Sequence, residues 1–236
     1  YLIPLPADWD SAQDAAWPAQ PLTAWYALTH LGALQADQQV MIHSAAGGVG
    51  LQAMKLVQAL GGRATGTVGS EEKATWLGQQ GFEDVLVRAP DFARQLQRHD
   101  RHFDLVLDAI GGQVQTASFN ALNPMGRLVV FGAAEFTPSQ NRPNYLKAAW
   151  RYLRRPRYDV MAMISSNRSV LAFNLIWLWE QKGKMQALLE ELKTIPLPPP
   201  HVGHRFAFDD AHTALALLRS GQSVGKVVLD AAPDPA

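Results

Sequence analysis

Cysteine is missing from all 236 residues of the chain. Without thiols there is no disulfide, no thiolate zinc site and no cysteine nucleophile. This usage fits a reducing compartment, so we expect a cytoplasmic protein. The chain also has no formal net charge, because 21 lysines and arginines balance 21 aspartates and glutamates. A neutral chain argues against nucleic acid or an anionic membrane as the main partner. No apolar run is long enough to span a membrane, and no secretory signal is visible.

What the chain does contain is the composition of a folded globular protein. Hydrophobic residues make up 47% of it and charged residues 18%, which is enough apolar surface for a core. The length suffices for one large domain or for one and a half. The chain opens on Tyr1 rather than on methionine, and we expect further residues upstream of it.

A glycine-rich turn near residue 46 is the feature around which the chain is organised. An apolar run over 40–43 precedes the turn, and a segment of helical length follows it. Strand, tight turn and helix in this order open a dinucleotide-binding unit, because small residues let a pyrophosphate approach the backbone. Ala45 replaces the first glycine of the usual spacing, and the alternative is that the glycines serve only helix–strand packing. The candidate phosphate-binding residues are Ala46, Gly47, Gly48, Val49 and Gly50.

Further strand-like runs follow at the spacing that parallel strands require. They cover 63–68, 84–87, 103–108, 127–131 and 169–173, with segments of helical length between most of them. The chain is therefore predicted to be an α/β protein with a doubly wound, parallel, six-stranded Rossmann sheet and helices on both faces. Ligands of such sheets sit beyond the carboxyl ends of the strands. This places in one crevice Gly69, Ser70, Asp108, Ile110, Gly111, Phe131, Gly132 and Ala133.

The end of the second strand favours NADP(H) over NAD(H). An NAD site usually has a carboxylate here that accepts from the ribose 2′-hydroxyl, and this chain has none. Gly69 and Ser70 are small instead, and Lys73 follows one helical turn later. A small polar residue with a cation nearby suits a 2′-phosphate. The alternative is an ordinary helix cap at Ser70 with surface charges behind it.

Three other features bear on function. The segment 137–159 mixes aromatic residues with arginines, which suits a phosphate, a headgroup or a flat substrate, although a solvated helix with inward-packed aromatics is the simpler interpretation. The histidines at 99 and 102, and at 201 and 204, have no context that aims two rings at one metal. Beyond Pro200, we predict a strand over 205–208, a helix over 210–220 capped by Asp209, and a last strand over 223–229.

Taken together, these pieces resemble the zinc-independent quinone oxidoreductase branch of the medium-chain dehydrogenase/reductase superfamily. The segments that carry the resemblance span nearly the whole chain and are 22–26, 43–50, 66–70 with Lys73, 131–133 and 225–229. Within that branch, three segments look most like the synaptic vesicle membrane protein (vesicle amine transport protein) subgroup, namely 142–144, 166–170 and 173–175.

The resemblance implies NADPH as the cofactor and a particular domain arrangement. Remnants of a GroES-like catalytic domain would lie at 1–20 and 196–236, around a Rossmann NADP-binding domain at 21–195. Ser223 and Lys226 would approach the cofactor from the C-terminal segment. Zinc-using relatives carry a cysteine where this chain has Ala19, so no metal site is expected.

The activity implied is zinc-independent hydride transfer from NADPH to a small-molecule quinone or α,β-unsaturated carbonyl. One alternative is an enoyl-thioester reductase domain of a polyketide or fatty-acid synthase, although such domains often carry a lysine at the position of Ala133. Another is an NADPH-binding interaction protein with little catalysis that uses 150–157 as its contact surface. No catalytic residue stands out in the sequence. The resemblance also implies a homodimer that forms through an edge strand of the sheet.

Overall fold

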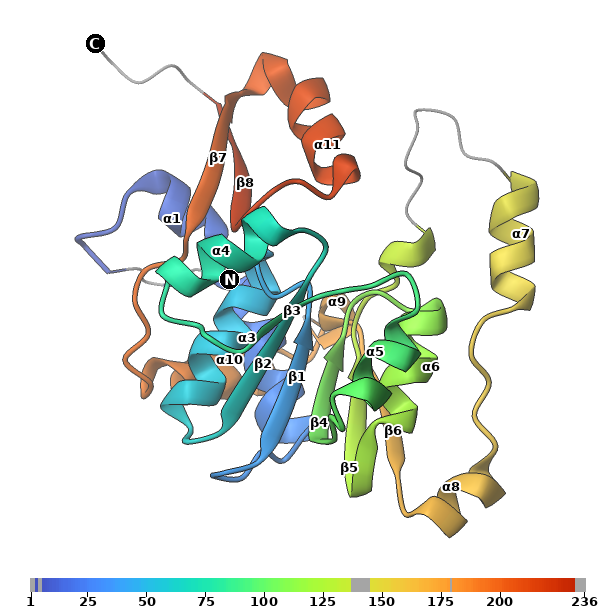
Figure 1. Ribbon diagram of the computed structural model, residues 1–236. Coiled ribbons are helices and arrows are strands. Elements are labelled where there is room, and N and C mark those ends of the chain that lie inside the picture. The colour runs from blue at the N-terminus through green and yellow to red at the C-terminus, as the bar shows by residue number, and fades with distance from the viewer. Residues whose placement is uncertain (1–2, 4–5, 137–144, 179, 232–236) are drawn as a thin grey trace.

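A parallel sheet forms the centre of the molecule, as the spacing of the apolar runs predicts. The computed structural model describes residues 3, 6–136, 145–178 and 180–231 (Figure 1). Six parallel strands lie in the order β3-β2-β1-β4-β5-β6, with a crossover between β1 and β4. Their bounds are β1 (Gln39–His43), β2 (Arg63–Val68), β3 (Val85–Val87), β4 (Phe103–Asp108), β5 (Leu122–Val130) and β6 (Ser169–Ala172).

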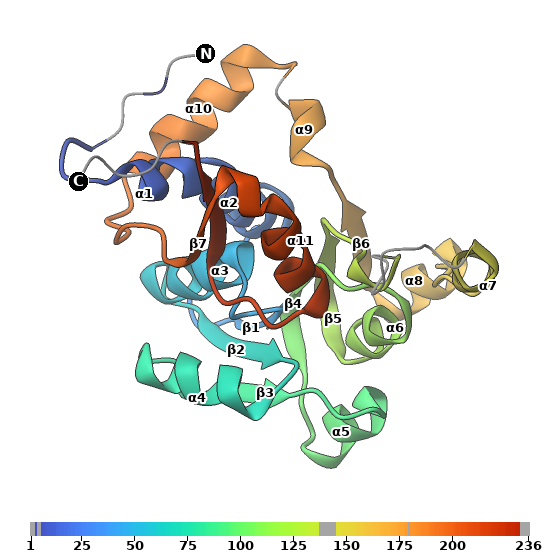
Figure 2. The same ribbon diagram turned by 90° about the horizontal axis from the view of Figure 1, so that it is seen from above.

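Helices connect the strands and cover both faces of the sheet (Figure 2). Those before β6 are α1 (Ser11–Ala16), α2 (Ala19–Trp25), the π-helix η1 (Tyr26–Leu31), α3 (Gly48–Ala59), α4 (Glu71–Gln79), α5 (Phe92–Arg98), α6 (Gly112–Asn120), the 3₁₀ turn η2 (Ala134–Phe136), α7 (Tyr145–Leu153) and α8 (Val160–Ser166). Those after β6 are α9 (Leu175–Leu178), α10 (Lys182–Lys193), the 3₁₀ turn η3 (Phe208–Asp210) and α11 (Ala211–Ser220).

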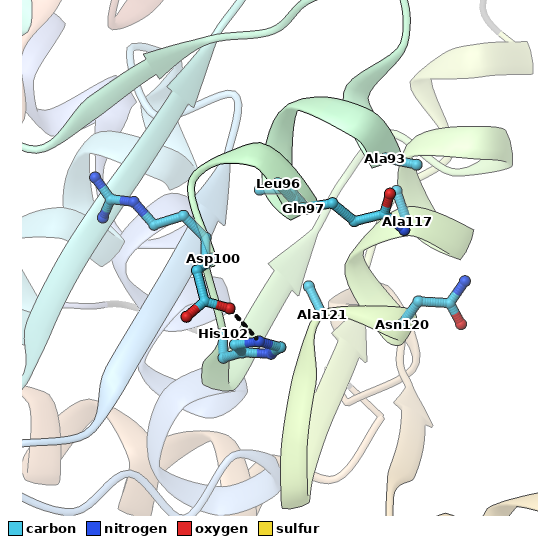
Figure 3. Close-up of a pocket in the computed structure, with 9 residues that line it drawn as sticks. Ala93, Leu96, Gln97, Asp100, His102, Ala117, Asn120 and Ala121 are labelled. Carbon is cyan, nitrogen blue, oxygen red and sulfur yellow. Dashed lines mark hydrogen bonds and ion pairs between the residues drawn. The ribbon is translucent and has the colours of Figure 1, made fainter.

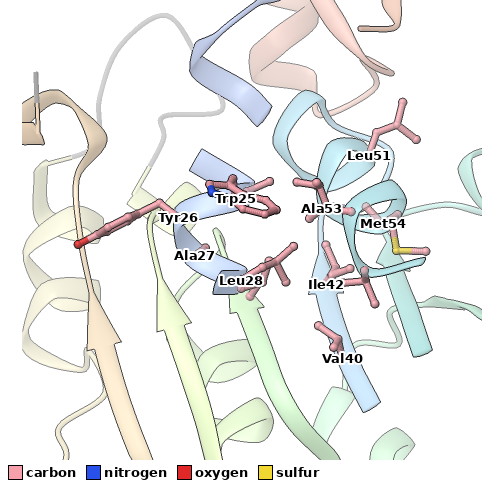
Figure 4. Packing of buried hydrophobic residues seen from close by; sticks show 14 of the residues in the cluster. Trp25, Tyr26, Ala27, Leu28, Val40, Ile42, Leu51, Ala53 and Met54 are labelled. Atoms are coloured by element: carbon pink, nitrogen blue, oxygen red, sulfur yellow. The ribbon is translucent and has the colours of Figure 1, made fainter. Parts of the chain in front are cut away.

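The core consists of two apolar layers, one on each face of the sheet. Val40 and Ile42 pack with α2, α3 and α10 on one face, whereas Met41 between them packs with α5 and α6 on the other. Figure 4 shows the first layer, where Trp25 and Leu28 lie over the strand side chains. Burial on both faces explains why the strands read as continuous apolar runs rather than as alternating patterns.

The fifth strand begins earlier than predicted. The sequence suggests a turn at 124–126 before a strand over 127–131, but β5 already begins at Leu122. Phe103 pairs with Leu122 and Leu105 pairs with Arg127, so the turn residues form an irregularity within the strand. Met125 has a φ of 68° at this point. The prediction of a turn was therefore correct locally, and the extra strand residues before it were missed.

The C-terminal segment forms a small parallel sheet of its own, from β7 (Val202–Ala207) and β8 (Lys226–Asp230). The amide of Gly225 donates to the Ala46 carbonyl at 2.8 Å, which attaches this segment to the glycine-rich turn. Asp209 does not cap the last helix as predicted. It lies inside η3, and α11 begins after Asp210 without a side-chain cap.

The aromatic residues of the helix after β5 do not pack inward, which corrects the simpler interpretation of this segment. In α7 the Trp150 side chain is 55% exposed and Leu146 is 85% exposed. The Arg154 guanidinium lies over the Trp150 ring, 4.1 Å from its centre. Residues 137–144 of the predicted segment lie outside the described residues. Within the ranges given above, no helix is both long and apolar enough to cross a bilayer.

Candidate functional site

A cleft of about 410 Å³ lies beyond the carboxyl ends of the central strands, where the Rossmann prediction places a ligand. Its walls come from the ends of β1, β2 and β4 and from the loops after β3 and β5. The C-terminal segment closes one side through Leu218, Gly221 and Ser223. The predicted site residues that line this cleft are Ala46, Gly47, Gly69, Lys73, Ile110 and Ser223.

The residues of the glycine-rich turn have different surroundings, because one lines the cleft and others are closely packed. Gly47 precedes α3 and faces the cleft, and the first amides of this helix have no acceptor inside it. Gly50 serves packing, because a Cβ there would lie 2.2 Å from the Ser44 carbonyl oxygen. A Cβ on Gly48 would lie 1.9 Å from the Gln20 amide nitrogen, so that side chain covers the turn from the α2 side. The packing interpretation therefore holds for Gly50, and Gly47 remains a candidate phosphate-binding residue.

Two cations line the cleft near the end of β2. Lys73 extends from the first turn of α4, and its Nζ donates to the carbonyls of Gly221 at 2.6 Å and Ser223 at 2.7 Å. Arg88 follows β3, and its guanidinium donates to Thr67 Oγ1 at 3.1 Å. Burial lowers the pKa of Lys73, and the charge of Arg88 lowers it further. An anion bound between these side chains would relieve their mutual repulsion.

Sequence reasoning missed Arg88, although a signal for it existed. Val68 pairs with Val87 in the parallel register, and the amide of Arg88 donates to the Val68 carbonyl at 2.9 Å. The residue after the third strand is therefore a neighbour of Gly69 after the second. Reading the ends of neighbouring parallel strands together, rather than one at a time, would have found this second cation.

Asp108 is at the predicted edge of the sheet but holds the loop after β4 rather than facing a ligand. Its side chain is 0% exposed. Oδ1 accepts from the amides of Ile110 at 2.8 Å and Gly111 at 3.2 Å. Burial raises the pKa of this carboxyl, and the two amide bonds oppose that rise. Gly111 has a φ of 89°, a conformation that favours glycine. Asp108 and Gly111 together fix the loop that presents Ile110 to the cleft.

The loop after β5 contributes an acid that the sequence did not single out. Glu135 lines the cleft, and its amide donates to the Ile110 carbonyl at 2.9 Å. Its side chain lies against the backbone of Gly112, where a Cβ would be 1.9 Å from Oε2. Arg151 of α7 donates to the Glu135 carbonyl. The cleft therefore has an asymmetric charge, with cations at the β2–β3 end and an acid at the β4–β5 end.

The remaining predicted residues lie around the cleft without lining it. Phe131 packs against the core near Phe173, with ring centres 6.1 Å apart. Gly132 lies close to the backbone of Ala109, because a Cβ on Gly132 would be 3.1 Å from the Ala109 Cα. The other predicted residues outside the lining are Val49 on α3, Ser70 before α4, Ala133 after β5 and Lys226 on β8.

Other hollows are separate from the strand ends. One of them, of about 200 Å³, lies between α5 and α6. Its lining includes His102 and Asp100, whose contact is dashed in Figure 3; the His102 Nε2 atom lies 3.2 Å from an Asp100 carboxylate oxygen. In the part of the chain that the structure describes, no three His, Cys, Asp or Glu side chains gather to hold a metal ion.

A doubly wound parallel sheet with a glycine-rich turn and a cleft at its strand ends defines a Rossmann-type fold. The family model of zinc-binding dehydrogenases matches residues 80–229. The chain belongs to this family, whose members include the quinone oxidoreductases of the medium-chain dehydrogenase/reductase superfamily, as the sequence resemblance predicts.

Two relatives illustrate how much of a longer protein the chain corresponds to. The synaptic vesicle membrane protein VAT-1 homolog of Danio rerio is 26% identical over 99% of this chain and 49% of its own length. The highly reducing polyketide synthase poxF of Penicillium oxalicum is 30% identical over 97% of this chain and 9% of its own length. The chain thus spans about half of the first relative and a small part of the second.

Two solved structures share the fold. The quinone oxidoreductase from Thermus thermophilus, solved also in complex with NADPH, has a TM-score of 0.75 and 28% identity, and the match covers 96% of this chain and 69% of that one. The CurK enoyl reductase has a TM-score of 0.74 and 26% identity, and the match covers 97% of this chain and 65% of that one. The prediction of a Rossmann doubly wound fold is confirmed.

Proposed function

We propose that this chain is the NADPH-binding part of a zinc-independent reductase of quinones or α,β-unsaturated carbonyls. The observation that carries the cofactor assignment is the pair of cations, Lys73 and Arg88, beside a strand end that has no carboxylate. A ribose 2′-hydroxyl would find no acceptor of that kind there, whereas a 2′-phosphate would meet two donors. The complex of the Thermus relative with NADPH supports this choice.

The cleft suggests how a bound dinucleotide would be oriented. Its adenosine half would lie at the β2–β3 end beside the two cations, and its diphosphate over Ala46 and Gly47. The nicotinamide half would lie toward Ile110, Ala134 and Glu135, at the carboxyl ends of β4 and β5. When bound, NADPH supplies a hydride; the residues of this chain hold the dinucleotide, set its direction and exclude water from one side.

A second candidate is the enoyl-thioester reductase domain of a polyketide synthase. The similarity to the Penicillium synthase and to the CurK enoyl reductase favours it. Both candidates transfer a hydride from the same cofactor and differ in the acceptor. We further propose that residues 1–20 and 196–236 belong to a catalytic domain shared with other segments, because α1 contacts β7 and β8. The homodimer expected from the resemblance would pair through an edge strand of the sheet, which is β3 on one side and β6 on the other.

The experiment that tests the proposal measures cofactor binding first and turnover second. Calorimetric titration of the 236-residue chain should show NADPH binding more tightly than NADH. Oxidation of NADPH should then be followed with 1,4-benzoquinone and with crotonyl-coenzyme A, using this chain and a longer form that carries more of the catalytic domain. Turnover of the quinone favours the first candidate, and turnover of the thioester alone favours the second. Absence of nucleotide binding would refute both.

A further inference from the structure

A line of buried polar side chains runs from helix α6 through the sheet to the cleft. Arg88 donates to Thr67 Oγ1 at 3.1 Å, and Thr67 Oγ1 lies 2.7 Å from His43 Nδ1. On the far side of the imidazole, Nε2 lies 2.7 Å from Ser118 Oγ. Ser118 Oγ in turn donates to the Val114 carbonyl at 2.8 Å. Residues on or just after three strands, together with one helix, therefore contribute to a single hydrogen-bonded chain.

The two ends of this chain fix the direction of the bonds that Arg88 and Ser118 donate. A guanidinium can only donate, so Thr67 Oγ1 accepts from Arg88, and its own hydrogen is free to go to His43 Nδ1. A carbonyl can only accept, so the Ser118 hydrogen goes to Val114 and its oxygen accepts from His43 Nε2–H. When the imidazole is neutral and carries its proton on Nε2, each donor of the chain meets an acceptor.

Burial keeps the imidazole in that state. His43 is 1% exposed, and burial together with the charge of Arg88 lowers its pKa to about 3. A neutral ring can accept from Thr67, whereas a protonated ring would direct a second N–H at the same hydroxyl. The chain of bonds therefore has one polarity near neutral pH. It ends at the guanidinium, whose bond to Thr67 fixes one edge and leaves other N–H groups for the cleft.

We propose that Thr67 and His43 are positioning residues that hold the Arg88 guanidinium at the angle at which it receives the 2′-phosphate of NADPH. This inference rests on the proposed function and adds a specificity device to it. A long arginine side chain has many rotamers, and holding it in one conformation before binding reduces the entropy lost on binding. The selectivity for NADPH over NADH would then depend on residues that never touch the cofactor.

The test compares the dissociation constants of NADPH and NADH for variants of the 236-residue chain. Thr67→Val removes the hydroxyl that accepts from Arg88 and keeps the shape of the side chain. Thr67→Ser keeps the hydroxyl. The matched control is Thr65→Val on the same strand, because Thr65 is equally buried but bonds to the Asp84 carboxylate, at 2.6 Å and away from the cleft. Thermal unfolding of each variant reports the loss of stability separately.

We expect Thr67→Val to weaken NADPH binding about 5-fold and to leave NADH binding within about 2-fold. Thr67→Ser and Thr65→Val should keep the wild-type ratio, although Thr65→Val also loses stability. An unchanged ratio in Thr67→Val, with Arg88→Met lowering it, would show that Arg88 orients itself and would overturn the inference. Equal binding of the two cofactors by the wild type would instead overturn the proposed preference for NADPH, and the positioning role of Thr67 and His43 with it.

Discussion

Replacing Lys73 with methionine tests the cofactor site most directly. Its Nζ donates to the carbonyls of Gly221 and Ser223, in the loop between α11 and β8. An ammonium carries three N–H groups, so one remains for a phosphate without breaking either bond. Lys73→Met keeps an unbranched apolar stem and removes the charge and the donors. The variant should therefore lose attraction for a 2′-phosphate while the stem still packs beside α11.

The size of the effect follows from the exposure of the side chain. Two unit charges about 4 Å apart attract by about 4 kcal/mol at an effective dielectric constant of about 20. Lys73 is only half-buried, so solvent screening reduces this to about 1–2 kcal/mol. NADPH binding should therefore weaken roughly 5- to 30-fold. NADH has no 2′-phosphate, and its affinity should change by less than about 2-fold.

Calorimetric titration with both cofactors measures this difference. The matched control is Lys55→Met, because Lys55 is also half-buried and has a pKa lowered by burial, yet it lies on α3 outside the cleft lining. The control should leave the affinity for both cofactors unchanged. An equal loss of NADPH and NADH affinity in Lys73→Met would refute the reasoning, because it would show that the lysine supports the fold of the site rather than the phosphate.

Two further predictions concern stability. Gly50→Ala should destabilise the chain by about 1–3 kcal/mol in urea unfolding, because its Cβ would meet Ser44 and Ala45. Gly78→Ala is the control, since nothing lies within 4 Å of the added atom, and equal stability of the two variants would contradict the packing argument. The pKa of His43 falls from 6.5 to about 3 on folding, so the unfolded state binds more protons between these values, and stability declines as the pH falls through this window. His43→Gln should flatten the decline by up to about 1.4 kcal/mol per pH unit, and an unchanged slope between about pH 4.5 and 6.5 would show that His43 does not titrate this way.

The fold could be predicted because local and long-range signals agree. Buried parallel strands produce apolar runs, and β2 and β4 lie where those runs predict them. The glycine turn could be placed because only small residues fit between Ser44 and α3. The prediction of strand bounds was wrong where those bounds depend on contacts between residues far apart in the sequence. Leu122 belongs to β5 only because it pairs with Phe103, and no local pattern marks it as part of a strand.

The candidate site could be predicted less completely, for a physical reason. Sequence reasoning found Lys73 because a cation one turn into a helix lies near the strand end that precedes it. Finding Arg88 and Glu135 requires knowing which strand ends are neighbours, which depends on the order and register of the sheet. Exposure of Trp150 likewise depends on what α7 contacts, and periodicity alone suggests an inward face.

The two cations of the cleft are better explained by a ligand than by stability. Burial lowers the pKa of both Lys73 and Arg88, and Arg88 lowers that of Lys73 as well, so their charges oppose folding in this place. Asp108 attracts the Arg88 charge, but its own carboxylate is committed to the amides of the β4 loop. The chain has zero net charge overall, yet two cations lie together at this strand end. Their repulsion disfavours the folded state, and a bound dianionic phosphate would turn it into attraction. Binding such an anion would raise the pKa of Lys73, so NADPH affinity should decline in alkaline solution more steeply than NADH affinity.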